Sequence, residues 1–339
     1  MKKILLTIIL FVLLCFAMPI LLTNRKTTEV SKIENNIENI VQEDTITNNN
    51  YKTVKVLHKE TGEVEEINME EYLYGVVSAE MPASYEIEAL KAQAVVARTY
   101  TAYKIAHAGK HPEADICDDA TCCQAWITKE ERLSRWKEEE REANWNKIVK
   151  AVDLTSGKII TYNGEPINAF FHSNSGGATE IVSNVWGGTD YPYLQSVQTS
   201  GEEGYSQYQS TVTLTKDELL EKLKIEHPEI EIDFSKENII QITEYTESGR
   251  VKTIQIGNIT ISGVEARKIF GLRSANFNVI IGDEITFNVI GYGHGVGLSQ
   301  TGADAMAKNG SNFEQIINHY YTGIKIENIW IKNVITVNN

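Results

Sequence analysis

The chain has 339 residues, with 46 acidic side chains against 32 Lys and Arg, which gives a formal net charge of −14 at neutral pH. So acidic a chain is unsuited to nucleic acid, teichoic acid or another polyanion as its main ligand, and leaves a neutral or weakly charged polymer open. Residues 51–339 suffice for one large domain or two closely packed ones, with a core able to support a cleft.

The first 50 residues predict a membrane anchor and a tether. Residues 1–3 form a short basic tip, and residues 4–22 are uncharged and apolar over a length that crosses a bilayer as one helix. No small-x-small cleavage site follows this run. Residues 23–50 are rich in Asn, Thr and Glu and have too little apolar surface to fold. We therefore expect a single-pass cell-membrane protein with a cytoplasmic N-terminus and an extracytoplasmic domain at 51–339.

The next segments alternate between strand and helix patterns. Two strands around Glu60-Thr61-Gly62 predict a hairpin, and a second hairpin is expected around the Asn163-Gly164 turn. Helices are predicted at 69–78, at 84–107 with Ser84 as its cap, and at 129–154, where Gly157 follows as a stop.

The C-terminal half adds a third region of strand and short-helix patterns at 212–282, which predicts a β-rich subdomain. Helices are expected near 301–309 and 312–320, followed by a final strand. The fold class is α+β, with the long helix after Glu80 lining a substrate groove.

Three stretches place small residues beside polar ones without a packing reason. They are VVSAEMPASYEIEALKAQAVVARTYT at 76–101, FHSNSGGATE at 171–180 and GYGHGVGLSQTGADAMA at 291–307. Together, in this order, they resemble the stage II sporulation protein D family, which also includes amidase-enhancer domains. The resemblance covers roughly residues 51–339. It departs at Thr301-Gly302, where relatives usually place an aromatic residue before the glycine.

The resemblance implies a lytic transglycosylase that cleaves the MurNAc-GlcNAc bond of peptide-stripped peptidoglycan strands during forespore engulfment. It implies Glu80, in the SAEMPA motif, as the catalytic residue. It also implies a position in the mother-cell membrane facing the forespore. The implied partners are a membrane-anchored amidase/endopeptidase and an integral membrane scaffold.

The residues around Glu80 agree in part with this role. A carboxyl among Ala79, Met81 and Pro82 is desolvated, which raises its pKa, whereas the dipole of the following helix would lower it. A plain helix-entry residue is the alternative. One carboxyl suffices for the chemistry, because it can protonate the glycosidic oxygen and then accept the proton of the C6 hydroxyl, provided its pKa is raised in the bound state.

Other polar residues of the motifs are candidates for substrate binding. Lys91 and Arg98 share one helix face, and the resemblance implies that they orient substrate, although ion pairing with Glu86, Glu88 or a neighbouring segment would explain them too. A serine nucleophile is disfavoured, because His172 and Ser173 point to opposite faces of an extended segment. The further candidates for the groove are His172, Ser173, Ser175, Tyr292, His294, Ser299 and Gln300.

The loop at 109–124 predicts a metal site. His111, Cys117, Cys122 and Cys123 fall within thirteen residues and can supply four tetrahedral ligands to Zn²⁺, with His107 in reserve. A disulfide from Cys117 to either later cysteine, or free thiols, are the alternatives. Four protein ligands would leave no position for water, so the zinc would be structural.

Three other functions remain open from the sequence. A non-catalytic amidase enhancer would bind glycan and tolerate loss of Glu80. A zinc-dependent hydrolase would need an open coordination position. A hydrolysing muramidase would release reducing ends instead of anhydro ends.

Overall fold

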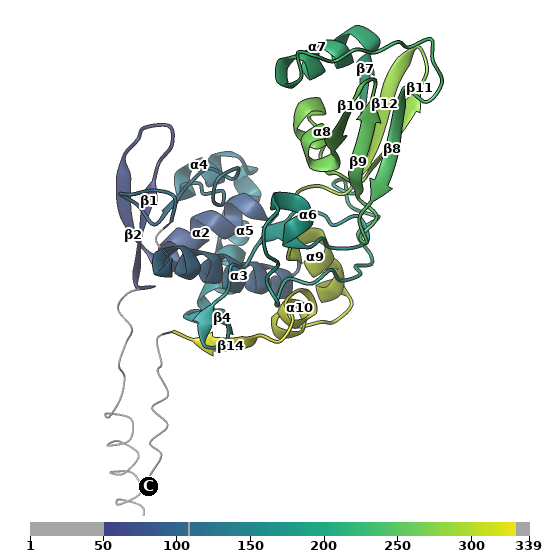
Figure 1. The fold of residues 1–339 in the computed structure, drawn as a ribbon. Helices are drawn as coiled ribbons and strands as arrows, with labels where there is room; N and C mark the ends of the chain where they lie inside the picture. Colours follow the sequence, from purple (N-terminus) through teal and green to yellow (C-terminus); the bar gives the residue numbers. More distant parts are fainter. Residues whose placement is uncertain (1–50, 108, 330–339) are drawn as a thin grey trace, which may run out of the picture. The chain divides into compact units, whose positions relative to one another are not determined.

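The computed structural model describes residues 51–107 and 109–329 (Figure 1). The predicted anchor at 4–22 and the predicted tether at 23–50 lie outside this range. Among the described residues, no helix is long and apolar enough to cross a membrane. This part of the chain is mixed α+β, as predicted, with nine helices and several small sheets.

The first core surrounds α3 (Ile87–Ala106), which is buried on nearly every face. Five buried alanines of this helix let its neighbours approach closely, and a sheet strand also packs on it. The packed neighbours are α2 (Met69–Glu80), α5 (Glu138–Asp153), β4 (Lys158–Tyr162), α9 (Gln300–Lys308) and α10 (Phe313–Tyr320).

Small sheets complete the first core. The predicted hairpin is β1 (Thr53–Leu57) with β2 (Val64–Asn68), and β3 (Ile116–Cys117) pairs with β1 in parallel. The second hairpin pairs β4 with β5 (Glu165–Pro166), and Asn163 and Gly164 have φ of 53° and 85° at its turn. The final strand, β14 (Lys325–Asn328), pairs with β4.

A short parallel pair brings two distant motifs together. β6 (Phe171–His172) lies beside β13 (Leu298–Ser299), with His172 opposite Ser299. The Asn174 and Tyr292 backbones also form a bridge. The motifs at 171–180 and 291–307 therefore form one surface.

The second core has its own cluster of buried hydrophobic residues between Leu214 and Val289. Two three-stranded sheets form it, in the orders β10-β9-β8 and β11-β12-β7, and α7 and α8 pack against the strands (Figure 1). Its elements are β7 (Gln209–Thr215), α7 (Lys216–Glu226), β8 (Ile240–Tyr245), β9 (Val251–Ile256), β10 (Ile259–Ser262), α8 (Gly263–Phe270), β11 (Phe277–Ile281) and β12 (Glu284–Ile290). The buried Arg250 ties it to the motif surface by donating to the carbonyls of Ser175 and Ala178.

Some predicted helix boundaries were wrong. α3 begins at Ile87 instead of Ser84, because the Glu86 backbone N–H donates to Asp304 Oδ1 at 2.6 Å, a tertiary bond that replaces a local cap. The predicted helix at 129–154 is interrupted between α4 (Lys129–Ser134) and α5, since Lys137 takes extended backbone angles. A short helix, α6 (Val182–Trp186), was not predicted.

Candidate active site

Glu80 is the last residue of α2, and its carboxylate bridges two segments that are distant in sequence. Oε1 accepts a hydrogen bond from the Ala125 backbone N–H at 2.7 Å, and Oε2 accepts one from Gln300 Nε2 at 3.2 Å. Burial raises the pKa of Glu80 above its ordinary value, although both hydrogen bonds oppose the shift. Its place at a helix C-terminus also disfavours the charged form, so the predicted stabilisation by the dipole of the next helix does not operate.

Glu80 lines two hollows, here named the two arms of the candidate groove. The first, here named the histidine arm, has a volume of about 380 Å³. Its lining includes Glu80, Phe171, His172, Ser173, Arg267, Tyr292, His294 and Gln300. The second, the tryptophan arm, has a volume of about 660 Å³. Its lining includes Glu80, Pro82, Arg132, Trp136, Glu140, Asn144 and Gln207. Both volumes are in the range of small-molecule sites.

The two histidines of the histidine arm are neutral. Burial lowers the pKa of His172 to about 3 and places the pKa of His294 well below its ordinary value. His172 Nδ1 donates to the Val296 carbonyl at 3.2 Å, and its buried Nε2 has no hydrogen-bond partner among the described residues. The unpartnered acceptor of His172 is thus enclosed in the wall of the arm, whereas Tyr292, 42 % exposed, presents its ring to the hollow.

Ser175 and Ser299 were expected in the groove, but they face a buried carboxylate instead. Both hydroxyls donate to Glu202, which also accepts from Thr199 at 2.6 Å and Thr301 at 2.9 Å. Burial alone would raise the pKa of Glu202, but these hydrogen bonds outweigh it and the pKa is lowered. Ser175, Ser299 and Thr301 thus hold the two motif loops to each other through Glu202.

The loop between α3 and α4 gathers one imidazole and three thiols. The donor atoms of His111, Cys117, Cys122 and Cys123 all lie within 4.8 Å of one another. His111 Nε2 is 3.5 Å and 3.7 Å from the sulfurs of Cys122 and Cys123, which are 3.9 Å apart. Tetrahedral zinc with ordinary bond lengths requires about 3.6 Å for N···S and about 3.8 Å for S···S. The donor set fits this ion.

The chemistry of the thiols also bears on this fit. The three cysteines are unbridged, and burial raises the pKa of Cys117 to about 12, so it stays a thiol unless a cation stabilises the thiolate. His107, the reserve ligand, instead stacks on Tyr103. Ala125, which binds Glu80, follows Cys123 by two residues, so this loop positions the carboxyl.

The three motifs lie in a chain with clear relatives. Stage II sporulation protein D of Bacillus subtilis (strain 168) is 39 % identical over 266 residues, which is 78 % of this chain and 75 % of the relative. The chain belongs to the stage II sporulation protein D family.

Other comparisons agree with this family. The stage II sporulation protein D of Bacillus amyloliquefaciens is 36 % identical over 81 % of this chain and 78 % of that protein. The family model described as stage II sporulation protein matches residues 57–162. An amidase enhancer of Bacillus subtilis is 29 % identical over 74 % of this chain, but only 39 % of the enhancer is covered. The two Bacillus relatives above 30 % identity are both sporulation proteins by name.

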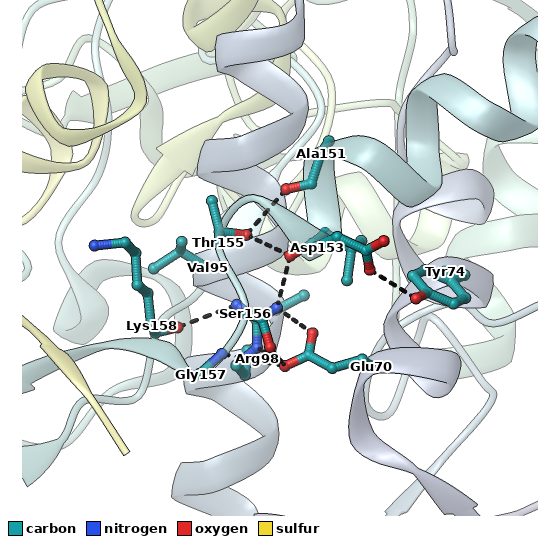
Figure 2. A network of polar contacts seen from close by, with 12 residues as sticks. Glu70, Tyr74, Val95, Arg98, Ala151, Asp153, Thr155, Ser156, Gly157 and Lys158 are labelled. Carbon is teal, nitrogen blue, oxygen red and sulfur yellow. Dashed lines mark hydrogen bonds and ion pairs between the residues drawn. The ribbon is translucent and has the colours of Figure 1, made fainter. Parts of the chain in front are cut away.

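The family resemblance placed Lys91 and Arg98 on the substrate, but the structure gives both side chains other partners. Arg98 is completely buried, pairs with Glu70 at 2.5 Å and donates to the Lys158 carbonyl at 3.1 Å (Figure 2). Lys91 Nζ lies 2.7 Å from Glu88 Oε1. Neither lines either arm of the groove. The alternative of structural ion pairs therefore replaces the expected substrate role.

Several residues that shape the groove carry no signal in the three motifs. Glu202 and Arg267 lie outside the three motifs, and no local pattern distinguishes them from solvated charges. Trp136 had a recognisable signal, since it is an aromatic residue in an otherwise highly charged segment. Its ring lies 4.7 Å from the Arg132 guanidinium, in the tryptophan arm.

Proposed function

We propose that the protein is a peptidoglycan lytic transglycosylase, which cleaves the MurNAc-GlcNAc bond of peptide-stripped glycan strands and leaves 1,6-anhydroMurNAc ends. The observation that carries the proposal is the position of Glu80. It is a carboxyl of raised pKa that lines both arms of the groove, so a strand lying along both arms would place a glycosidic bond beside it.

The first step needs an acid. A raised pKa keeps a larger fraction of Glu80 protonated near neutral pH than an ordinary glutamate would have. Its proton passes to the glycosidic oxygen as the bond to C1 of MurNAc breaks, and the GlcNAc end leaves with a hydroxyl at C4. The Ala125 N–H and the Gln300 amide orient the carboxyl throughout.

The second step needs a base. Glu80, now a carboxylate, takes the proton of the C6 hydroxyl as that oxygen bonds to C1, which regenerates the acid and consumes no water. Hydrolysis through two carboxylates needs a second one flanking the bond. Among the described residues, Glu80 is the carboxylate that lines the histidine arm, and Glu140, which is exposed, lines the tryptophan arm. A hydrolase would therefore need Glu140 as its second carboxylate, whereas a transglycosylase would not.

The remaining polar groups bind sugar in this proposal. Tyr292 and Trp136 offer ring faces, and His172, Ser173 and His294 line the histidine arm beside Glu80. Neutral imidazoles suit an uncharged sugar backbone.

We propose that His111, Cys117, Cys122 and Cys123 hold one structural Zn²⁺. Four protein ligands would close the coordination sphere, which argues against a zinc-dependent hydrolase. The ion would fix the loop that carries Ala125, and with it the donor to Glu80.

The cellular role that we propose follows the family. The domain at 51–339 would act outside the cytoplasm, anchored by residues 4–22 in the mother-cell membrane facing the forespore, during engulfment. A membrane-anchored amidase/endopeptidase would supply the stripped strands, and an integral membrane scaffold would hold both enzymes in place.

A non-catalytic amidase enhancer is the second candidate, because one relative has that name. The test is digestion of peptide-free glycan strands by the full-length chain in detergent, with Glu80→Gln and Glu140→Gln variants and mass spectrometry of the product ends. We expect anhydro ends from the wild type and Glu140→Gln, and none from Glu80→Gln. Reducing ends that require both carboxylates would indicate a muramidase. Binding without cleavage would indicate the enhancer.

A further inference from the structure

Arg267 is a cation without a counterion in the histidine arm. It lies on α8 of the second core and lines the same hollow as Glu80, His172 and His294. Among the described residues its guanidinium forms no ion pair or hydrogen bond, and only its backbone carbonyl is bonded, to the Leu272 and Gly271 N–H groups at the end of the helix. The second core therefore delivers one unpaired guanidinium to the groove.

Two neighbouring cations, by contrast, do have hydrogen-bond or ion-pair partners. Arg250 donates to two carbonyls and to Ser248, and Lys268, the next residue along α8, pairs with Glu226 at 3.1 Å. Glu180, which lines a small adjacent cavity with Arg267, already accepts four hydrogen bonds. In a chain of net charge −14, a half-buried cation that no carboxylate compensates is unfavourable for the free protein.

The substrate offers one anion that would compensate it. The sugar backbone of a glycan strand is neutral, but each MurNAc carries a lactyl ether whose carboxyl is an amide when a stem peptide is attached and a free carboxylate when the peptide has been removed. A guanidinium binds a carboxylate with two parallel hydrogen bonds, and it cannot make this contact with an amide.

We propose that Arg267 binds the free lactyl carboxylate of MurNAc and thereby makes the groove select peptide-stripped strands. The proposal rests on the proposed function, since it takes a glycan strand as the ligand of the groove. Arg267 is then a specificity residue. The second core supplies this residue, and the two motif loops supply the sugar contacts.

The test compares two forms of one ligand. Peptide-free strands carry lactyl carboxylates, and treatment with carbodiimide and ammonia converts these to carboxamides without changing the sugars. Binding is measured by fluorescence anisotropy of labelled strands on full-length protein carrying Glu80→Gln, so that no cleavage occurs. Arg267→Gln is compared with Lys268→Gln, which removes the same charge from the same helix but from an exposed side chain.

We expect Arg267→Gln to weaken binding of carboxylate strands by about ten- to a hundredfold, as loss of a charge-assisted hydrogen bond does, and to leave carboxamide strands unchanged. Lys268→Gln should alter neither affinity. An unchanged thermal unfolding midpoint for Arg267→Gln shows that the fold is intact. Equal weakening for both strand forms, or weakening for neither, overturns the proposal.

Failure of the proposed function and failure of the Arg267 proposal give different results. If the wild type cleaves no strand but still prefers carboxylate over carboxamide strands in an Arg267-dependent way, the transglycosylase proposal falls and the role of Arg267 stands. If the wild type cleaves and binds both strand forms equally, the role of Arg267 falls and the transglycosylase stands.

Discussion

Replacing Arg98 by Met should destabilise the fold without weakening glycan binding. The side chain is completely buried, and its loss leaves the Glu70 carboxylate, which is 17 % exposed, without its cation, and the Lys158 carbonyl without a donor (Figure 2). Breaking a buried ion pair costs about 3–5 kcal/mol. Glu70 keeps hydrogen bonds from Ser156 and Gly157, so we expect the lower end, about 3 kcal/mol of unfolding free energy.

Urea unfolding followed by tryptophan fluorescence measures this loss, and glycan binding is measured in the same preparation below the transition. Lys91→Met is the matched control, since its pair with Glu88 is partly exposed and should contribute less than about 1 kcal/mol. The double variant with Glu70→Gln should be less destabilised than the two single losses added together.

The opposite pattern would refute this reasoning. If Arg98→Met unfolds at the wild-type urea concentration but binds stripped strands at least tenfold more weakly, the side chain reaches substrate in solution. The role implied by the family resemblance would then be correct, and the buried pair with Glu70 would not describe the working protein.

Three more predictions concern the groove and the cysteine loop beside it. Because burial raises the pKa of Glu80 and the acid must be protonated at the start, kcat/KM should fall as pH rises through a pKa above the usual glutamate value of about 4.3; a pH-rate profile with its limb at the ordinary value contradicts this. Removing metal with a chelator should lower the thermal unfolding midpoint, and adding back Zn²⁺ but not Mg²⁺ should restore it; an unchanged midpoint means that no structural ion is held at His111 and the three cysteines. Trp136→Ala should weaken binding of long strands by about fivefold or more through loss of a stacking face, and should weaken binding less for short oligomers that fill the histidine arm alone. An equal loss of affinity for long and short ligands would mean that no sugar binds in the tryptophan arm.

The fold could be predicted from the sequence where local chemistry decided it. The Asn163-Gly164 turn has positive φ at both residues, as its hairpin requires, and Asn312 caps α10 with a complete capping box. The start of α3 could not be predicted, because the group that satisfies the Glu86 N–H is Asp304, which lies 218 positions away. Local patterns cannot reveal such a bond.

The candidate site likewise contains residues that the sequence could predict and residues that it could not. The motifs correctly brought His172, Ser173, Tyr292, His294 and Gln300 to one hollow with Glu80. Helical spacing put Lys91 and Arg98 on one face, but it could not tell whether that face met the groove or the protein interior. Arg267 could not be found, since its place in the groove depends on how the second core joins the motif loops.

Glu80 and Glu202 show why one buried carboxylate is suited to chemistry and the other to structure. Glu202 accepts hydrogen bonds from four hydroxyls and a backbone N–H, and these hold its pKa low despite burial, so it stays charged and fixes the motif loops. Glu80 accepts two hydrogen bonds, at a helix C-terminus, and burial prevails. A carboxyl that must give and take a proton needs this weaker solvation, because a fully satisfied carboxylate such as Glu202 is too weak a base to recover the proton. Among the described residues, Glu80 itself accepts only two hydrogen bonds, and one of them comes from Gln300. Glu202 helps to fix Gln300, because it accepts a hydrogen bond from Ser299, the preceding residue and the last of β13.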